Sequence, residues 1–206
     1  MANDDFIRGL LPVNTKGGNA SVQVRKYEAD SSGVAAPIFI GQPVVQQASG
    51  LISNAAPLGA SGVLYLGVAV GFLDANDGVP STPYNDSGGT VKRYVLVADD
   101  PNQEFEIQSD TGGTLAGLSE RGATCDLIYR SPINSVGSGN NITGFANLEL
   151  DGSSFVATNS GAVTLVRIKD QTNTDGTQNV AGNYAKWIVK ITNHQYRGQP
   201  IVNTAV

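Results

Sequence analysis

The sequence predicts an all-β protein: an antiparallel β-sandwich or barrel with an extended N-terminal arm, long loops and little or no helix. Three observations lead to this prediction. Apolar and polar residues alternate in several short segments, which is typical of strands with one buried face. Charged residues make up only 15% of the 206 residues while Gly accounts for 25 of them, so turns are favoured over helices. Hydrophobic residues reach 40%, which argues against generic disorder.

The charge balance limits the classes of partner. The chain carries 13 Lys and Arg against 18 Asp and Glu, and its formal net charge is −5. A nucleic-acid binder needs a cationic surface that displaces counterions, so we expect neither nucleic acid nor a membrane surface as a partner. No segment reaches the ~18 consecutive apolar residues of a membrane-spanning helix. Residues 1–6 are acidic and lack the cationic region of a secretory signal, so we expect a soluble protein that is not exported.

We divide the chain into an N-terminal arm, residues 1–20, and a single β domain, residues 21–206. The arm holds a short apolar run at 6–11 between polar residues. It is either a first strand with a frayed end or an arm that docks on a neighbouring subunit. Alternation then predicts a strand at 21–28, which ends at a turn over 30–33.

The next segments predict short strands around a long buried one. Strands are expected at 37–40 and 44–47, and Pro43 between them places this pair at a sheet edge or bend. The longest apolar run, 62–73, is predicted to be a central strand buried on both faces, with Gly67 and Gly71 as bulge or bend points. Loops are expected at 48–61, 74–89 and 131–144.

The middle of the chain is predicted to form a hairpin. A strand at 91–97 leads into turn residues at 99–102, and a strand at 104–108 follows. Glu104 and Glu106 are two positions apart, so on a strand both would point to one face. The two carboxyl groups of a glycosidase face each other across a cleft, so these side-by-side residues predict a solvated or interface-facing strand.

Turn signals continue to separate short strands through the rest of the chain. A single helical turn is expected at 115–122, where Gly122 would end it. The remaining polar loop is expected at 170–182. The remaining strands are expected at 124–129, 145–150, 162–168 and 184–191.

The sequence contains no catalytic, metal or cofactor-binding constellation, so we expect neither an enzyme nor a bound cofactor. Cys125 is the only cysteine and lacks a basic neighbour, which predicts a buried structural thiol. His194 is the only histidine and is predicted to be a hydrogen-bonded structural residue. One Cys and one His do not supply a zinc site. The Asp- and Asn-rich loops at 74–78 and 171–182 lack the ligand set of a calcium loop.

Three stretches carry a resemblance to a known class of protein. They are DPNQEFEIQ at 100–108, GATCDLI at 122–128 and YAKWIVKITNHQ at 184–195. In these stretches, and in the order of the segments between them, the chain resembles virion structural proteins of marine tailed phages, including cyanophages. The similar region spans residues 91–195, and residues 1–90 match less clearly.

The resemblance implies a capsid decoration, or cement, protein. Such a protein binds the outer surface of the major capsid protein lattice and ties neighbouring capsomers together. It would lie on the capsid exterior of a virion assembled in the host cytoplasm. It would also associate with itself, with a trimer favoured, because symmetry multiplies weak contacts. Two alternatives stay open: another virion module (tail, neck or spike), and a glycan-binding β-sandwich that stacks sugars on Tyr84, Tyr129 and Tyr196.

Contacts with the capsid or a neighbouring subunit are expected in the arm and in the long loops. Apolar, aromatic and Arg side chains anchor protein interfaces. In this chain we expect such side chains to be accessible to a partner in the arm and in the long loops. The predicted contact residues are Phe6, Ile7, Arg8, Leu10, Leu11, Leu51, Ile52 and Tyr84.

Overall fold

The computed structural model confirms the all-β prediction. It describes residues 3–13, 22–30, 36–55, 58, 63–86, 92–111, 121–130, 135–136, 139–155 and 161–197. Within these ranges the chain forms strands, bridges and turns but no helix. The helical turn predicted at 115–122 falls largely outside the described residues.

Short strands account for the regular structure. Half of them have Gly, Asn or Asp directly before or after the strand, and these residues favour turns over continued pairing. In chain order they are β1 (Leu11–Pro12), β2 (Arg25–Glu28), β3 (Pro43–Gln46), β4 (Ile52–Asn54), β5 (Gly67–Leu73), β6 (Tyr94–Ala98), β7 (Phe105–Gln108), β8 (Thr124–Cys125), β9 (Leu127–Tyr129), β10 (Ser135–Val136), β11 (Gly139–Asn140), β12 (Leu148–Leu150), β13 (Val163–Ile168) and β14 (Lys186–Ile191).

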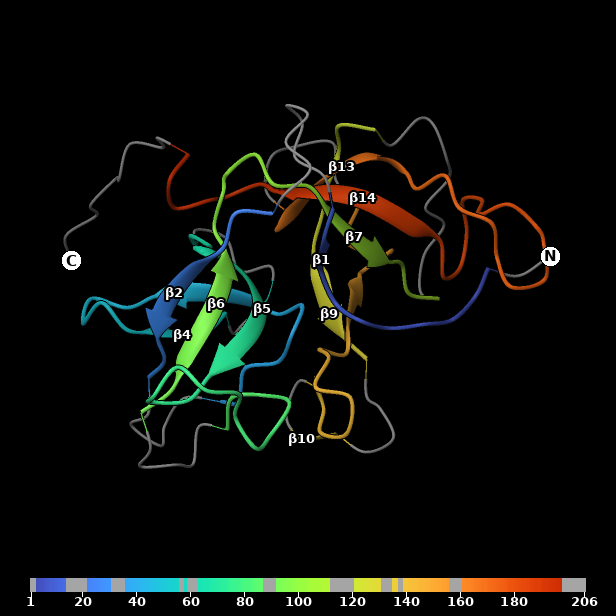
Figure 1. Ribbon diagram of the computed structural model, residues 1–206. Helices are drawn as coiled ribbons and strands as arrows, with labels where there is room; N and C mark the ends of the chain where they lie inside the picture. The colour runs from blue at the N-terminus through green and yellow to red at the C-terminus, as the bar shows by residue number, and fades with distance from the viewer. Residues whose placement is uncertain are drawn as a thin grey trace.

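Two five-stranded antiparallel sheets form the body of the protein. One has the order β1-β7-β14-β13-β8 and the other has the order β2-β6-β5-β3-β4. Two-stranded ribbons, β12-β9 and β10-β11, accompany them. In Figure 1 the sheet with β2, β6 and β5 lies on the left, and β7, β13 and β14 lie on the right. Both sheets are open, so the architecture is sandwich-like and not a closed barrel.

The hairpin predicted at 91–108 is wrong. β6 lies between β2 and β5 in one sheet, whereas β7 lies between β1 and β14 in the other. The turn itself is present, because Asp100 Oδ1 accepts a hydrogen bond from the Asn102 N–H at 2.7 Å. It carries the chain from β6 in one sheet to β7 in the other.

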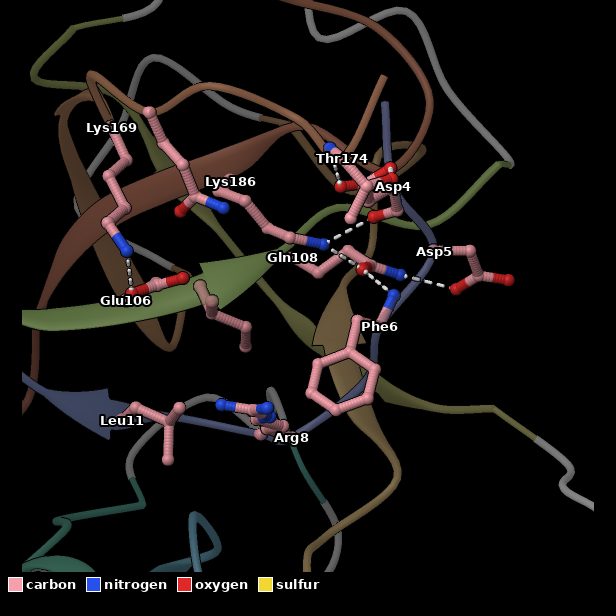
Figure 2. Close-up of a pocket in the computed structure, with 13 residues that line it drawn as sticks. Asp4, Asp5, Phe6, Arg8, Leu11, Glu106, Gln108, Lys169, Thr174 and Lys186 are labelled. Atoms are coloured by element: carbon pink, nitrogen blue, oxygen red, sulfur yellow. Dashed lines mark hydrogen bonds and ion pairs between the residues drawn. The ribbon is translucent and has the colours of Figure 1, made fainter. Parts of the chain in front are cut away.

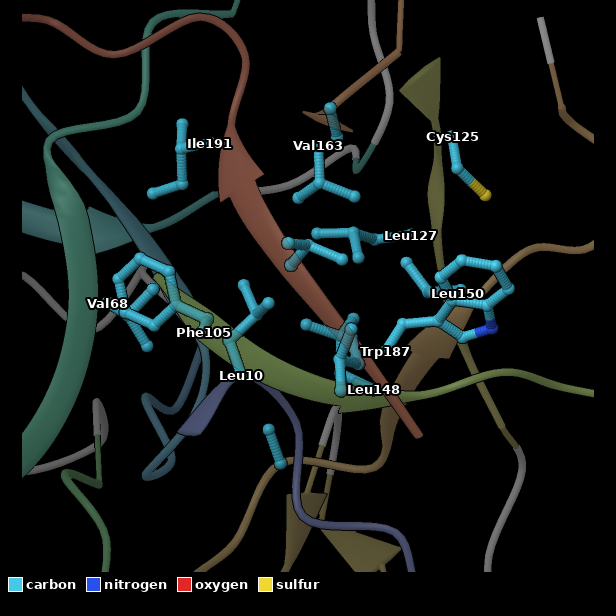
Figure 3. Close-up of a cluster of buried hydrophobic side chains, with 14 of the residues drawn as sticks. Leu10, Val68, Phe105, Cys125, Leu127, Leu148, Leu150, Val163, Trp187 and Ile191 are labelled. Carbon is cyan, nitrogen blue, oxygen red and sulfur yellow. The ribbon is translucent and has the colours of Figure 1, made fainter. Parts of the chain in front are cut away.

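The larger core packs on the β7-β14-β13 strands and the β12-β9 ribbon, and it also takes in Val68 of β5 and Ala98 of β6 from the other sheet. Figure 3 shows Leu10 and Phe105 in this cluster together with Trp187 and Leu150. Trp187 is the largest fully buried side chain described. Each such side chain contributes roughly 1.5–3 kcal/mol when removed from water. The second core packs on the other sheet and contains Val44, Ile52, Leu66, Val95 and Val97.

The long apolar run forms the central strand that the sequence predicts. β5 is the middle strand of its sheet, and the pairing of β5 with β6 shifts register between Ala69 and Gly71. Gly67 permits a close approach, because a Cβ there would lie 2.3 Å from the carbonyl oxygen of Ala98. The predicted role of Gly71 as a bulge or bend point is confirmed, whereas Gly67 is the first residue of the strand and marks a close backbone contact.

Two of the predicted loops contain strands. Within 48–61, β4 pairs with β3, because Ile52 is apolar and enters the second core. Within 131–144, β10 pairs with β11. Conversely, the strand predicted at 37–40 is reduced to isolated bridges that join Ile38 to Asn85 and Ile40 to Phe145.

Candidate functional site

Residues 3–13, here called the N-terminal segment, lie against the body of the domain. Leu11 and Pro12 pair with Glu106 and Phe105 of β7. The N–H of Leu10 donates to the carbonyl of Gly41 at 2.8 Å. The described part of the arm ends in a strand of the sheet, as the first of the two predictions has it, but its start is held by hydrogen bonds and is not frayed. Docking on a neighbouring subunit stays a prediction.

Side chains at the start of the segment tie it to the loops around β14. The Asn3 amide donates to the carbonyls of Val180 and Asn183 at 2.8 and 3.0 Å. The Asp4 carboxylate accepts from the backbone N–H of Thr174 at 2.7 Å and from its hydroxyl at 2.8 Å. The segment is therefore held at both of its ends.

Two glycines bring the segment close to the loop before β3. Gly9 and Gly41 have φ of +68° and +84°. A Cβ at Gly41 would lie 2.3 Å from the carbonyl oxygen of Arg8, and a Cβ at Gly9 would lie 2.5 Å from the carbonyl oxygen of Gly41. A side chain at either position would push the two backbones apart.

A pocket of about 590 Å³ lies between the N-terminal segment and the sheet. Its walls come from the segment, from β7, from the loop that follows β13 and from the first residue of β14 (Figure 2). Lysines, carboxylates and amides dominate its polar side, and Phe6, Leu11 and Ile107 provide apolar surface.

A buried hydrogen-bond network centred on Gln108 forms one wall of the pocket. Lys186 stands directly opposite Gln108 in the pairing of β14 with β7, and only 6% of Lys186 is exposed. Its Nζ donates to Gln108 Oε1 and to the carbonyl of Asp4 (Figure 2). Gln108 Oε1 also accepts the backbone N–H of Phe6 at 2.7 Å.

The other end of the Gln108 amide meets two carboxylates. Nε2 donates to Asp5 Oδ1 and to Glu149 Oε1, both at 2.8 Å. Both N–H groups of this amide are thus used, and its oxygen accepts twice. This pattern fixes which end of the amide is oxygen.

Burial shifts the protonation of the charged groups on either side of Gln108. Loss of solvent lowers the pKa of Lys186 from its usual range. Loss of solvent raises the pKa of Glu149, which is 1% exposed and belongs to β12. Arg130 approaches Glu149 at 3.6 Å and holds Asp5 at 2.9 Å.

A second lysine on the pocket wall forms an ordinary ion pair. Lys169 Nζ lies 2.5 Å from Glu106 Oε2 (Figure 2). Both side chains keep contact with solvent, at 30% and 19% exposure. Nearby, Gln171 Oε1 is buried without a hydrogen-bond partner in the described part of the chain.

At the surface beside the pocket lie Phe6, Arg8 and Phe145, here called the Phe6 cluster. The Arg8 guanidinium lies 3.9 Å from the centre of the Phe6 ring and 5.8 Å from the centre of the Phe145 ring. The cation and ring faces attract each other electrostatically. Phe6 is 54% exposed, so the cluster presents apolar surface to solvent.

The predicted contact residues divide into exposed and buried groups. Phe6 and Arg8 are exposed, and Ile7, Leu11 and Leu51 are partly exposed. Leu10 and Ile52 are fully buried in the two cores, so their side chains are not on a surface that a partner would meet. Tyr84 is half-buried and stacks on Phe39, with ring centres 4.9 Å apart.

The other two tyrosines proposed as sugar-stacking platforms also contact side chains of the chain. The Tyr129 hydroxyl accepts a hydrogen bond from Gln42 Nε2 at 2.8 Å. The Tyr196 hydroxyl lies 3.3 Å from that of Tyr27. These contacts hold the tyrosines within the fold.

The predicted burial of Cys125 and the predicted hydrogen bonding of His194 are confirmed, although His194 Nε2 is buried without a hydrogen-bond partner in the described part of the chain. Cys125 is fully buried, its thiol donates to the carbonyl of Asp151 at 3.0 Å, and burial raises its pKa to about 12. His194 is buried, its Nδ1 accepts the N–H of Tyr196 at 3.1 Å, and loss of solvent lowers its pKa.

The side chains of Glu104 and Glu106 differ in their surroundings. Glu104 is 7% exposed, so the prediction that both glutamates face solvent or an interface is wrong for this residue. It lies beside the turn where the chain enters β7, beneath the N-terminal segment, and its carbonyl accepts the N–H of Val13 at 2.8 Å. Among the described residues, no cluster of three or more His, Cys, Asp or Glu could hold a metal ion, and no helix could cross a membrane.

The residues at the centre of the network were not predicted from the sequence. Gln108 is the last residue of β7, Lys186 is the first residue of β14, and Glu149 is the middle residue of β12. Glu149 lies between Leu148 and Leu150, and both leucines are fully buried. A charged residue between two apolar strand residues is a signal that could have identified Glu149, whereas Gln108 and Lys186 carry no comparable signal.

No protein-family model, curated protein or solved structure matches the chain. The resemblance to phage virion proteins therefore stays a prediction.

Proposed function

We propose that the chain is a non-enzymatic capsid decoration protein of a tailed phage, which binds the outer surface of the major capsid protein lattice and stabilises the head. The resemblance over residues 91–195 supports this proposal. The structural observation that carries it is the exposed Phe6 cluster on a firmly held N-terminal segment.

The Phe6 cluster has the properties of an interface anchor. Aromatic and Arg side chains supply a large share of binding energy in protein interfaces. Hydrogen bonds hold the segment at Asn3, Asp4 and Leu10. Such a segment loses little conformational freedom when it binds, so more of the contact energy remains as affinity.

A cement role also requires many weak contacts to act together. We propose that the protein associates with itself, most simply as a trimer at a local three-fold axis of the lattice, so that several Phe6 clusters bind at once. In this proposal its location is the exterior of a virion assembled in the host cytoplasm. Neither nucleic acid nor membrane takes part.

Heads that lack the protein provide the test. Purified protein is added back, binding is measured by co-sedimentation, and genome release is followed on heating. Phe6→Ala is expected to weaken binding about 30-fold, because an interface anchor contributes about 2 kcal/mol. Val24→Ala, at another apolar side chain that is 42% exposed, serves as the matched control and is expected to bind like the wild type.

Two results would contradict the proposal. One is equal heat resistance of heads with and without the protein. The other is equal binding of Phe6→Ala and Val24→Ala. A particle reconstruction that places the chain in the tail, neck or spike would replace the decoration role with a role at that location.

A further inference from the structure

The environment of Gln108 contains every group needed to form an amide bond to a lysine. We propose that Lys186 and Gln108 are joined by an intramolecular isopeptide bond, which forms without another enzyme once the chain has folded. This inference rests on the buried network and is independent of the capsid role.

The two side chains are placed for reaction by the sheet. Lys186 and Gln108 are register partners on the neighbouring strands β14 and β7, and both are buried. Lys186 Nζ is hydrogen-bonded to Gln108 Oε1 (Figure 2). The electrophilic carbon Cδ lies one carbonyl bond, about 1.2 Å, from that oxygen. Such fixed proximity replaces a bimolecular encounter and removes much of the entropic barrier.

The N-terminal segment supplies a donor for the charge that develops during attack. Addition of an amine to an amide places negative charge on the amide oxygen. The backbone N–H of Phe6 already donates to Gln108 Oε1 at 2.7 Å. Two residues earlier, the carbonyl of Asp4 accepts from Lys186 Nζ at 2.6 Å and so orients the amine. The segment therefore positions the nucleophile and stabilises the oxyanion.

Glu149 is placed to move the proton. Its Oε1 lies 2.8 Å from Gln108 Nε2, the nitrogen that must leave. The reactive forms are an uncharged amine and a protonated carboxyl group. Burial favours both, because it lowers the pKa of Lys186 and raises the pKa of Glu149.

The step balances without a further reactant. The lone pair on Lys186 Nζ attacks Gln108 Cδ, and a tetrahedral intermediate forms. Glu149 gives its proton to Nε2 and receives one from Nζ. The Cδ–Nε2 bond then breaks and ammonia leaves. One amide bond between Nζ and Cδ has formed, one ammonia has been released, and Glu149 has returned to its starting state.

The nearby pair Lys169 and Glu106 lacks these features and serves as an internal control. Its atoms are as close, at 2.5 Å, but both side chains reach solvent. Among the described residues, neither side chain of this pair is hydrogen-bonded to a third carboxyl group or to a backbone donor that would assist the reaction. An amide formed there would release water instead of ammonia, so the two products differ in mass.

Mass spectrometry of the purified full-length chain tests the proposal. The wild type is expected to be lighter than its sequence mass by one ammonia. After trypsin digestion, the peptide containing Gln108 should be joined to the peptide containing Lys186, with no cleavage after Lys186. Lys186→Arg and Glu149→Gln are expected to keep the full mass, whereas Lys169→Arg should still lose ammonia.

The wild-type measurement decides the question even if a variant fails to fold. Full sequence mass with separate Gln108 and Lys186 peptides would overturn the proposal. Loss of ammonia that maps to a cyclised Asn, or loss of water that maps to Lys169 and Glu106, would overturn it too. A cross-link that persists in Glu149→Gln would overturn the acid–base role given to Glu149.

Discussion

Replacing Gly41 with Ala tests whether the N-terminal segment is held on the body by close backbone contact. Gly41 has φ of +84°, and an added Cβ would lie 2.3 Å from the carbonyl oxygen of Arg8. Gly50 has the same φ of +84°, but an added Cβ there would meet nothing within 4 Å. Gly50→Ala is therefore a matched control that has the backbone strain without the clash.

The expected losses follow from these contacts. A left-handed Ala costs about 1–2 kcal/mol in both variants. In Gly41→Ala the segment must also move away. That movement breaks the 2.8 Å hydrogen bond from the Leu10 N–H to the Gly41 carbonyl, worth about 1 kcal/mol. It also exposes part of the fully buried Leu10 side chain, whose burial contributes about 1.5–3 kcal/mol. We expect a total loss of about 3–5 kcal/mol for Gly41→Ala and about 1–2 kcal/mol for Gly50→Ala.

Urea unfolding measures the two losses, because the free energy of unfolding falls linearly with denaturant. Native-state hydrogen exchange of the Phe6 and Leu10 amides adds a local readout. Both amides donate hydrogen bonds, to Gln108 Oε1 and to the Gly41 carbonyl. Gly41→Ala should lower the protection of both amides from hydrogen exchange. Gly50→Ala should lower it only as far as the drop in the free energy of unfolding accounts for.

Equal losses of stability in the two variants would refute this reasoning. So would full protection of the Leu10 amide in Gly41→Ala. Either result would mean that the segment accommodates the methyl group without leaving the body.

Two further predictions concern buried rings. Trp187 is fully buried and its Nε1 has no hydrogen-bond partner in the described part of the chain. Trp187→Ala should lower the free energy of unfolding by about 3–5 kcal/mol and Trp187→Phe by about 1–2 kcal/mol, because both variants remove the unpartnered donor but Phe leaves the smaller cavity; equal losses in urea unfolding would argue against this. The pKa of His194 lies below 6.5 in the folded state because of burial, so the unfolded chain takes up this proton at a higher pH. The stability due to His194 is therefore present above about pH 6.5 and is lost as the pH falls below it. In His194→Gln, the free energy of unfolding measured in urea should depend less steeply on pH across this range. An unchanged dependence on pH would show that other groups dominate.

Local sequence pattern predicted the strands where one face is apolar. The strands Val163–Ile168 and Lys186–Ile191 fall within segments predicted as strands, and Tyr94–Ala98 extends one residue beyond the strand predicted at 91–97. Gly67 and Gly71 were predicted as bend points because glycine in a strand leaves room for close backbone approach. In such segments the spacing of the apolar residues indicates which side chains leave water, and Lys186, which is buried at the start of its strand, is the exception.

The pattern failed where several choices of partner satisfy the same local signal. The turn at 99–102 has the chemistry of a hairpin, yet the strands on either side of it join different sheets. Ile52 and Leu10 have the apolar character of contact residues, and both enter a core. A short sequence pattern does not state which of several apolar surfaces a strand will cover, since that depends on segments far away in the chain.

The candidate site shows the same division. The sequence by itself determined an all-β chain, its acidic balance, its isolated Cys125 and His194, and an apolar run near the N-terminus that includes Phe6. Only the tertiary structure brought Lys186, Gln108 and Glu149 together, from positions 186, 108 and 149 on three strands. Residue types decide which groups can ionise or react, whereas proximity and burial, which set their pKa and reactivity, exist only after distant strands have paired.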